Sequence, residues 1–288
     1  MLGMTQVSTP AEAATRLTGR AVARQRGLSG AVTEVVLDSG DTVVVKQGHA
    51  KNATSAEAAG LRWLGEADAV RVPEVRGYDE EWLVTELVGG GQPTHHAAER
   101  LGRGLAALHT AGAPAFGAAP PEGPVEAWIG LAPMENAQGE DWPRWYAEHR
   151  VLPYVRRAVD EGTLDTDEAA AIEQACARLP AVAGPAEPPA RLHGDLWNGN
   201  VLWGPVEAAL IDPAAHGGHR ETDLAMLHLF GCPLLDRVLA AYQEVTPLAE
   251  GWTDRIGAHQ LFPLLVHTVL FGRSYAGQAV AAAKAVGR

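Results

Sequence analysis

Hydrophobic and polar positions alternate in the first part of the chain in a way that is typical of β-strands. Two β-branched runs flank Ser39-Gly40-Asp41, a sequence that favours a tight turn, and together they predict a β-hairpin. Glu57, Leu61 and Leu64 share one face at helical spacing and predict a helix. The predicted elements are strands over Ala31–Asp38, Thr42–Lys46 and Trp82–Leu87, and a helix over Thr54–Leu64.

The rest of the chain mostly follows the periodicity of helices. Leu101, Leu105 and Leu108 lie on one helical face, and Gly112 ends that pattern. Further helices are predicted over Trp142–Val159, Asp167–Leu179 and the chain after Thr222, with short strands over Val201–Trp203 and Ala208–Ile211. This part of the sequence therefore predicts a mainly helical unit that contains a little sheet.

A run of three glycines, Gly89-Gly90-Gly91, separates the two regions. We expect a small β-rich lobe over residues 1–88 and a larger, mostly helical lobe over residues 89–288. The chain has 288 residues, of which 47% are apolar, enough to bury the core of one large or two modest domains. The predicted fold class is α+β.

Charge and cysteine content narrow the classes of function. The net charge of −12 disfavours a general binder of the nucleic-acid backbone. No apolar run approaches the roughly 18–20 residues of a membrane span, and residues 1–10 lack the basic and apolar segments of a secretory leader. Cys176 and Cys232 are too few and too far apart for a disulfide framework. We expect a soluble, cytoplasmic protein that binds neither nucleic acid nor membrane.

The strongest chemical signal is a loop with the sequence HGDLWNGN at 193–200, followed by a further aspartate, Asp212. Asn200 and Asp212 offer amide and carboxylate oxygens, which suit Mg²⁺ when substrate phosphates complete its shell. Asp195 is then free to accept a hydroxyl proton, as in the H-x-D-x-x-x-x-N pattern of phosphoryl-transfer enzymes. A single Asp or Asn in a loop is commonly a turn residue, but the combined spacing favours a catalytic loop.

Phosphoryl transfer also calls for a lysine on a strand and a carboxylate that holds it. Lys46 ends a predicted strand, as the phosphate-binding lysine of kinases does. Lysine stands at only three positions, whereas 20 of the 23 basic residues are Arg, which favours a role that needs an ammonium group. Glu57 is the expected partner of Lys46. The alternative is that Thr54 and Glu57 form a capping box at the helix start.

A glycine-containing segment before the first predicted strand is a weaker candidate for contact with the nucleotide. Its sequence is Gly27-Leu28-Ser29-Gly30, which differs from G-x-G-x-x-G. Such a segment on its own is more commonly a turn. In a kinase, Gly27, Ser29 and Gly30 would lie near the phosphates.

Taken together, these residues resemble the fructosamine (ketosamine) kinase family, within the superfamily of aminoglycoside phosphotransferases and protein kinases. The matching segments span nearly the whole chain: HGDLWNGN at 193–200, IDPAAHGGHRETDLAM at 211–226, GLRWLGE at 60–66, LAALH at 105–109, HRVLPY at 149–154 and LFGRSYAGQA at 270–279. The resemblance implies a two-lobed protein-kinase-like fold. It also implies ATP-dependent phosphorylation of the sugar 3-hydroxyl of ketosamines such as fructosamine and ribulosamine adducts. Spontaneous decay of the 3-phosphate would free the amine, so the family is associated with protein deglycation.

The resemblance implies a role for each matching residue. Asp195 would be the catalytic base, Asn200 and Asp212 would hold Mg²⁺, and Lys46 with Glu57 would orient ATP. The acceptor would be a small ketosamine or a glycated amine of a protein.

Other positions would border the two substrates. The backbone from Glu86 to Val88 would meet the adenine, and Trp197 would lie beside the chemistry. Two positions depart from the family pattern, because His216 stands where Tyr is expected and Met134 where Gln is expected. Both would border the sugar, so these departures bear on substrate preference.

Three other functions compete with a ketosamine kinase. A kinase of the same superfamily could act on aminoglycosides or choline, and the acidic net charge is compatible with a polycationic substrate. A non-catalytic nucleotide-binding module is disfavoured because all five catalytic positions are filled. A metal-dependent hydrolase could use His193, His216 and His219, but their spacing does not match H-E-x-x-H. We expect His193 to brace the catalytic loop instead, and Asp223 to support that loop or cap a helix.

Overall fold

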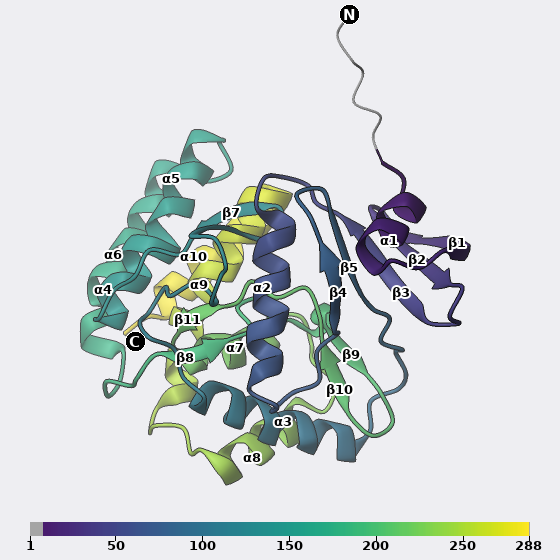
Figure 1. The fold of residues 1–288 in the computed structure, drawn as a ribbon. Coiled ribbons are helices and arrows are strands. Elements are labelled where there is room, and N and C mark those ends of the chain that lie inside the picture. Colours follow the sequence, from purple (N-terminus) through teal and green to yellow (C-terminus); the bar gives the residue numbers. More distant parts are fainter. Residues whose placement is uncertain (1–7, 288) are drawn as a thin grey trace, which may run out of the picture.

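The computed structural model describes residues 8–287, which form two lobes (Figure 1). Residues 1–7, which contain most of the segment in which a secretory leader was sought, lie outside the described residues. Among the described residues, no helix is both long and apolar enough to cross a membrane. The strands of the small lobe lie at the upper right of Figure 1, and the helical lobe fills the left and the bottom.

The small lobe is a five-stranded antiparallel sheet with the strand order β1-β2-β3-β5-β4. Its elements are α1 (Pro10–Thr18), β1 (Val22–Ser29), β2 (Val32–Leu37), β3 (Thr42–Gln47), α2 (Ala53–Glu66), β4 (Val75–Tyr78) and β5 (Trp82–Glu86). The predicted strands at β2, β3 and β5 and the predicted helix at α2 are confirmed. Sequence reasoning missed α1, β1 and β4.

The alternation along β3 separates the core of this lobe from the cleft. Val43 and Val45 are buried against α1 in one apolar cluster. Val44 and Lys46 alternate with them, so they face the opposite side of the sheet. Both line a cavity there. The alternation of side chains along β3 therefore places Lys46 on the face of the sheet that borders the cleft between the lobes.

The large lobe is mostly helical. Its elements are α3 (His95–Thr110), β6 (Glu126–Ile129), β7 (Ala132–Glu135), α4 (Trp142–Tyr146), a π-helical turn (Ala147–Val151), α5 (Leu152–Asp160), α6 (Thr166–Val182), β8 (Ala190–Leu192), a 3₁₀ turn (Asn198–Asn200), β9 (Val201–Trp203), β10 (Ala208–Leu210), β11 (His216–Gly218), α7 (Arg220–Leu227), α8 (Leu235–Val245), α9 (Trp252–Phe271), a 3₁₀ turn (Arg273–Tyr275) and α10 (Ala276–Ala285). The helix predicted over Trp142–Val159 is present but contains the π-helical turn. The lobe boundary at residues 88 and 89 stays a prediction.

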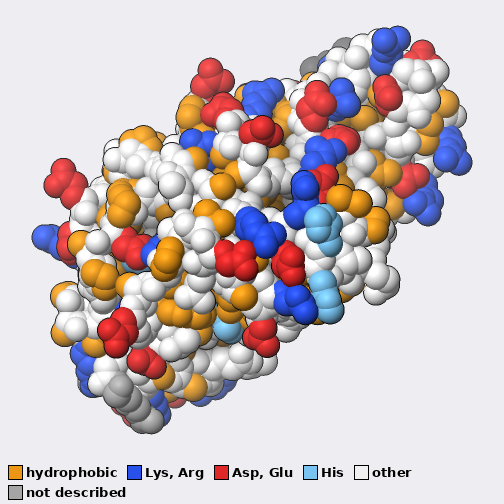
Figure 2. Space-filling model, turned by 90° about the horizontal axis from the view of Figure 1, so that it is seen from below, with side chains coloured by type: hydrophobic (Ala, Val, Ile, Leu, Met, Phe, Trp, Pro, Cys, Tyr) orange, Lys and Arg blue, Asp and Glu red, His pale blue; other side chains and the backbone are white. Residues whose placement is uncertain are grey.

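The large lobe also contains three two-stranded ladders, β6–β7, β8–β11 and β9–β10. On the face seen in Figure 2, acidic and basic side chains are interspersed. Between α3 and α8, Arg103 pairs with Glu244 at 3.0 Å and Arg237 pairs with Glu99 at 3.0 Å. Exposed pairs of this kind contribute little to stability, so the apolar clusters hold the lobe together.

Candidate active site

The loop after β8 carries Asp195 and has a backbone that only glycine permits at position 194. Gly194 has φ +82°, and a Cβ there would lie 2.1 Å from the Ala214 carbonyl oxygen. The buried carboxylate of Asp223 accepts hydrogen bonds from the backbone N–H groups of His193, at 2.7 Å, and Gly194, at 2.9 Å. His109 Nε2 lies 3.3 Å from the same carboxylate. Asp223 thus supports the loop, and it is His219 that caps α7.

His193 braces the loop from inside. Its Nδ1 accepts from the Asp195 backbone N–H at 3.3 Å, and its Nε2 therefore donates to the Ile211 carbonyl at 2.9 Å. Burial lowers the pKa of His193, which keeps the ring neutral. The ring joins the loop to the strand end that leads to Asp212.

The Asp195 carboxylate is held by Asn200. Asn200 Nδ2 donates to Asp195 Oδ2 at 2.9 Å and to the Asp195 carbonyl at 2.9 Å. Burial raises the pKa of Asp195 to about 7, and the negative charges of Asp212 and Asp223 act in the same direction, whereas the Asn200 hydrogen bond lowers the pKa. Asp195 is therefore a far better proton acceptor than an exposed aspartate.

Lys46 contacts two carboxylates, one in each lobe. Its Nζ lies 2.7 Å from Glu57 Oε2, on α2, and 3.1 Å from Asp212 Oδ1, in the large lobe. Burial alone would lower the pKa of Lys46, but attraction to these carboxylates outweighs it and raises the pKa. The Thr54 hydroxyl donates instead to the Asp79 carbonyl, and the N-cap position is Asn52. The arrangement is an ion pair between Lys46 and Glu57, and not a capping box.

Asn200 and Asp212 offer oxygen ligands on the same side of the cleft. Both hydrogen bonds of the Asn200 side chain use Nδ2, so Oδ1 stays available. The backbone N–H of Ile211 donates to the Asn200 carbonyl at 3.0 Å, which ties the two positions together. Asp212 adopts φ +52°, an unusual conformation for a residue with a side chain and one that recurs at functional sites. An amide oxygen and a carboxylate fit a hard divalent cation such as Mg²⁺.

Two cavities meet at this cluster. One, of about 320 Å³, lies under β1–β3 and β5 and has apolar walls that include Val44, Leu83 and Ile211. The other, of about 290 Å³, opens towards the β6–β7 hairpin and contains Asp195. Lys46, Glu57, Leu83 and Asp212 line both cavities. A flat apolar group can therefore occupy the first cavity while a polar acceptor occupies the second, with the charged cluster between them.

The predicted nucleotide contacts divide into two groups. Ser29, Glu86 and Val88 line the first cavity. Gly27 and Gly30 are not among its lining residues. They do not precede the first strand, as the sequence suggested, because Gly27 lies within β1 and Gly30 forms its turn with φ +48°. The Glu86 carboxylate pairs with Arg71. Contact between the backbone from Glu86 to Val88 and an adenine stays a prediction.

The predicted substrate residues also separate. Trp197 is 36% exposed and lines the second cavity, where its ring packs over Gly199. His216 lies in β11, is buried, and is not among the residues that line that cavity. Its Nδ1 bonds the Ala214 carbonyl at 2.8 Å, and burial lowers its pKa to about 3. His216 thus stands behind the cavity wall as a neutral ring, which corrects the expectation that it borders the sugar.

Sequence reasoning missed several residues that shape the site. His109 and Tyr242 join Asp223 in a buried chain, with His109 Nδ1 at 2.9 Å from the Tyr242 hydroxyl. Asn136 lines the second cavity, and Arg150 holds its side chain. These residues lie far from the HGDLWNGN loop in sequence, and a lone His, Asn or Arg carries no spacing signal that would have identified it.

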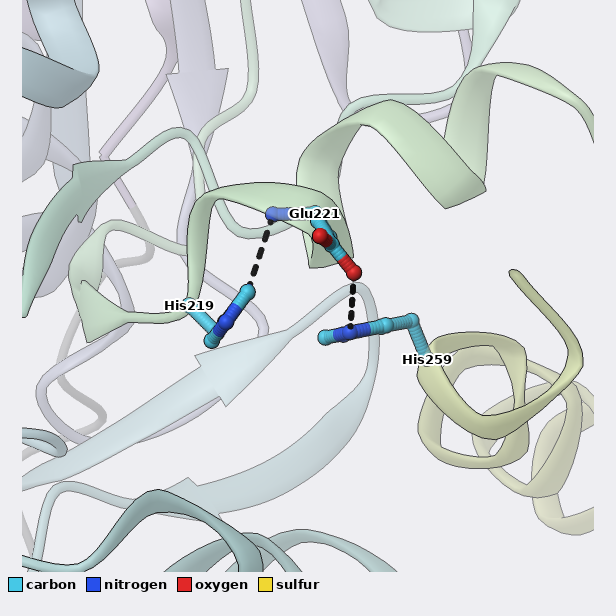
Figure 3. Close-up of side chains that lie close together, drawn as sticks. All are labelled: His219, Glu221 and His259. Atoms are coloured by element: carbon cyan, nitrogen blue, oxygen red, sulfur yellow. Dashed lines mark hydrogen bonds and ion pairs between the residues drawn. The ribbon is translucent and has the colours of Figure 1, made fainter. Parts of the chain in front are cut away.

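A buried group formed by His219, Glu221 and His259 lies away from the cavities and has the composition of a metal site (Figure 3). Its candidate ligand atoms lie within 4.8 Å of one another. However, Arg255 donates to both Glu221 oxygens, at 2.8 and 2.6 Å. The ion pair supplies the positive charge that a divalent cation would bring, so we interpret the group as a structural network. This interpretation removes the support for a hydrolase.

Comparisons with known proteins agree with this geometry. The fructosamine kinase family model matches residues 7–286. A "Probable ketoamine kinase" of Thermus thermophilus is 36% identical over 223 residues, which cover 77% of this chain and 78% of that protein. The "Protein-ribulosamine 3-kinase, chloroplastic" of Arabidopsis thaliana is 30% identical over 236 residues, which cover 78% of this chain and 69% of that protein.

Solved structures support the same assignment. A crystal structure from Thermobifida fusca, assigned as a fructosamine-3-kinase, has a TM-score of 0.90 and 49% identity, covering 97% of this chain and 99% of that one. An aminoglycoside phosphotransferase has a TM-score of 0.62 at 15% identity, covering 96% and 99%, which shows a shared fold alone. The two-lobed, protein-kinase-like α+β fold and the use of ATP follow. The chain belongs to the fructosamine kinase family.

Proposed function

We propose that this protein transfers the γ-phosphoryl group of ATP to the sugar 3-hydroxyl of ketosamines, such as fructosamine or ribulosamine adducts of amines. The observation that carries the proposal is the meeting of the two cavities at Lys46, Glu57 and Asp212, with Asp195 in the second cavity. The family membership and the ketoamine and ribulosamine names of the relatives support this choice of acceptor.

In this proposal ATP occupies the cavity under the sheet. The adenine meets the backbone between Glu86 and Val88, and Lys46, held by Glu57, contacts the phosphates. Lys46 also contacts Asp212 in this structure. A bound cation would take the place of the Lys46 ammonium at the Asp212 carboxylate. Asn200 Oδ1 and the Asp212 carboxylate would hold Mg²⁺, which neutralises charge on the phosphates when bound.

Asp195 receives the acceptor in the second cavity. Its carboxylate, fixed by Asn200, accepts a hydrogen bond from the reacting hydroxyl and aims its oxygen at the γ-phosphorus. In a loose transition state the proton leaves late, so Asp195 chiefly positions the hydroxyl and then takes the proton. Its raised pKa matches that second task.

The walls of the second cavity favour a sugar over a polycation. Its carboxylates are Glu57, Asp195 and Asp212, and each of them already has a place in the proposed machinery. No further carboxylate among the described residues lines the cavity to hold the several ammonium groups of an aminoglycoside. Trp197 and Trp128 offer aromatic surface, which suits the faces of a sugar.

The experiment measures Mg²⁺-dependent ADP release with two ketosamines, fructosyl-lysine and ribulosyl-lysine, and compares it with ADP release in the presence of kanamycin or choline. We expect turnover with a ketosamine and none with the other acceptors. Asp195→Asn should lower kcat by about 10²–10⁴-fold. Turnover with kanamycin or choline alone would keep the fold and overturn the acceptor.

Folding of the variant can be checked independently. The pKa of Asp195 is raised in the folded state, so ionising this buried carboxylate costs stability as the pH rises from its ordinary pKa to about 7. Asp195→Asn removes that cost, and its melting temperature at pH 8 should equal or exceed that of the unaltered protein. A fall in melting temperature would assign the lost rate to misfolding.

A further inference from the structure

Asn136 follows β7 and lines the acceptor cavity, with only 2% of its surface exposed. Its Oδ1 accepts a hydrogen bond from Arg150 Nη2 at 3.0 Å. A guanidinium group can only donate, so the amide atom that faces it must be the oxygen. The orientation of the amide is therefore fixed by chemistry. Its Nδ2 is buried and has no hydrogen-bond partner within residues 8–287.

Arg150 is a rigid support for this amide. It comes from the π-helical turn Ala147–Val151, an insertion that recurs at functional sites. Its Nη1 donates to the Glu135 carbonyl at 2.7 Å, and its guanidinium lies 4.7 Å from the centre of the Trp145 ring. Burial lowers the pKa of Arg150 to about 10, which still leaves it protonated at neutral pH. It therefore holds the Asn136 oxygen throughout the physiological range.

An amide donor that is buried without a partner is costly, and native proteins rarely keep one. At the wall of a substrate cavity, the missing partner is most simply an atom of the substrate. Asp195 lines the same cavity, so an acceptor that presents a hydroxyl to Asp195 occupies the space that Asn136 also borders.

We propose that Asn136 Nδ2 donates a hydrogen bond to an uncharged oxygen on a carbon next to the reacting hydroxyl. This assignment rests on the proposed function, in which the reacting group is the 3-hydroxyl of a ketosamine. Such a substrate carries oxygen at both neighbouring carbons, C2 and C4. Asn136 is then a specificity-determining residue that selects alcohols flanked by oxygen.

The same pair of residues disfavours alcohols that are flanked by an ammonium group. An ammonium cannot accept a hydrogen bond, and it would approach the positive end of an amide that Arg150 polarises. This would add a repulsive element against aminoglycosides to the attractive one for ketoses.

The test compares kcat/KM for a ketosamine, its 2-deoxy analogue and its 4-deoxy analogue, in the unaltered enzyme and in Asn136→Ala. One analogue should lose roughly 3- to 10-fold in the unaltered enzyme, the usual range for a neutral hydrogen bond. Asn136→Ala should lower kcat/KM for the parent ketosamine by the same factor and should make no further distinction against that analogue. The analogue affected identifies the oxygen.

Two further variants separate recognition from folding. Asn136→Asp keeps an oxygen that accepts from Arg150, so this variant should fold normally. It replaces the Nδ2 donor with a carboxylate oxygen, so turnover should still fall if the substrate atom that faces Asn136 is a carbonyl oxygen. Asn52→Gly removes an amide that contacts the same hairpin, at the Glu126 carbonyl, from a position with φ +65° that glycine adopts readily. It should leave kcat/KM unchanged.

The assignment would be overturned if each deoxy analogue lost the same factor in kcat/KM, relative to the parent ketosamine, in Asn136→Ala as in the unaltered enzyme. The side chain and the substrate oxygen would then be uncoupled. A drop in melting temperature of Asn136→Ala with unchanged discrimination would make Asn136 a structural residue only. Failure of the proposed function would give a different result, because the unaltered enzyme would then turn over no ketosamine at all. The assignment of Asn136 would fail with it.

Discussion

At the scale of single residues, the environment of Asp195 changes what this side chain can do. An exposed aspartate has a pKa of about 3.9 and binds protons weakly at neutral pH. Burial raises the pKa of Asp195 to about 7, and the nearby carboxylates of Asp212 and Asp223 act in the same direction against the hydrogen bond from Asn200. The sequence indicated which residue would meet the acceptor, whereas the altered acidity depends on packing that no local pattern encodes.

This acidity predicts the pH dependence of the reaction. Asp195 must be ionised to accept the hydroxyl proton, so kcat/KM should rise with pH through the pKa of the free enzyme. We expect the acidic limb of kcat/KM to lie near pH 7. Rates measured from pH 5 to 9, with acceptor well below KM, locate the limb. A plateau that extends down to pH 5 would show that Asp195 stays ionised or has another role.

The sequence predicted the positions of some site residues correctly and missed or misplaced others. Lys46 and Glu57 could be paired because one ends an alternating strand and the other lies on a helix that faces it. Asn136 could not be found, because its importance comes from Arg150 and from the cavity wall. His216 was misplaced because a position in the family pattern does not specify which way a strand residue points.

At the scale of elements, α7 and the catalytic loop form one unit through Asp223. The carboxylate accepts two backbone hydrogen bonds from the loop, and buried His109 lies on its other side. Two backbone donors and a histidine stabilise the ionised form, so the pKa of Asp223 stays below its usual range despite burial.

Replacing Asp223 with asparagine should therefore weaken the loop. An amide offers only one acceptor atom where the carboxylate offers two, so one buried N–H loses its partner. We expect a loss of about 1–3 kcal/mol in the free energy of unfolding, together with a lower kcat. Denaturant unfolding and steady-state kinetics measure the two effects. Asp236→Asn, at the exposed start of α8, is the matched control, and equal behaviour of the two variants would contradict the account.

The elements that sequence patterns predicted are those with a clear buried face. Strand β3 alternates strictly, and α2 keeps its apolar positions on one side. Strand β1 escaped prediction because its side chains are almost all exposed and its polar and apolar residues do not alternate, as an edge strand permits. Helix α1 escaped because its buried side chains are alanines, which give little periodic contrast.

At the scale of the whole molecule, the two lobes bring distant parts of the chain to one cluster. Lys46 comes from the sheet, Glu57 from α2 and Asp212 from the end of a ladder in the large lobe. The pairing of lobes could be expected from the family resemblance, but the two adjoining cavities required the structure. The Glu221–Arg255 network is separate from the candidate active site, because it is buried within the large lobe and lines neither cavity.

The most direct test of the central claim is to locate the phosphate in the product. The purified enzyme is given ATP, Mg²⁺ and ribulosyl-lysine, and the product is followed by phosphorus and carbon NMR. We predict a single phosphate ester at C3 of the sugar, followed by slow release of unmodified lysine as that ester decomposes. A phosphate at another carbon, or ADP formed with no sugar phosphate, would contradict the account.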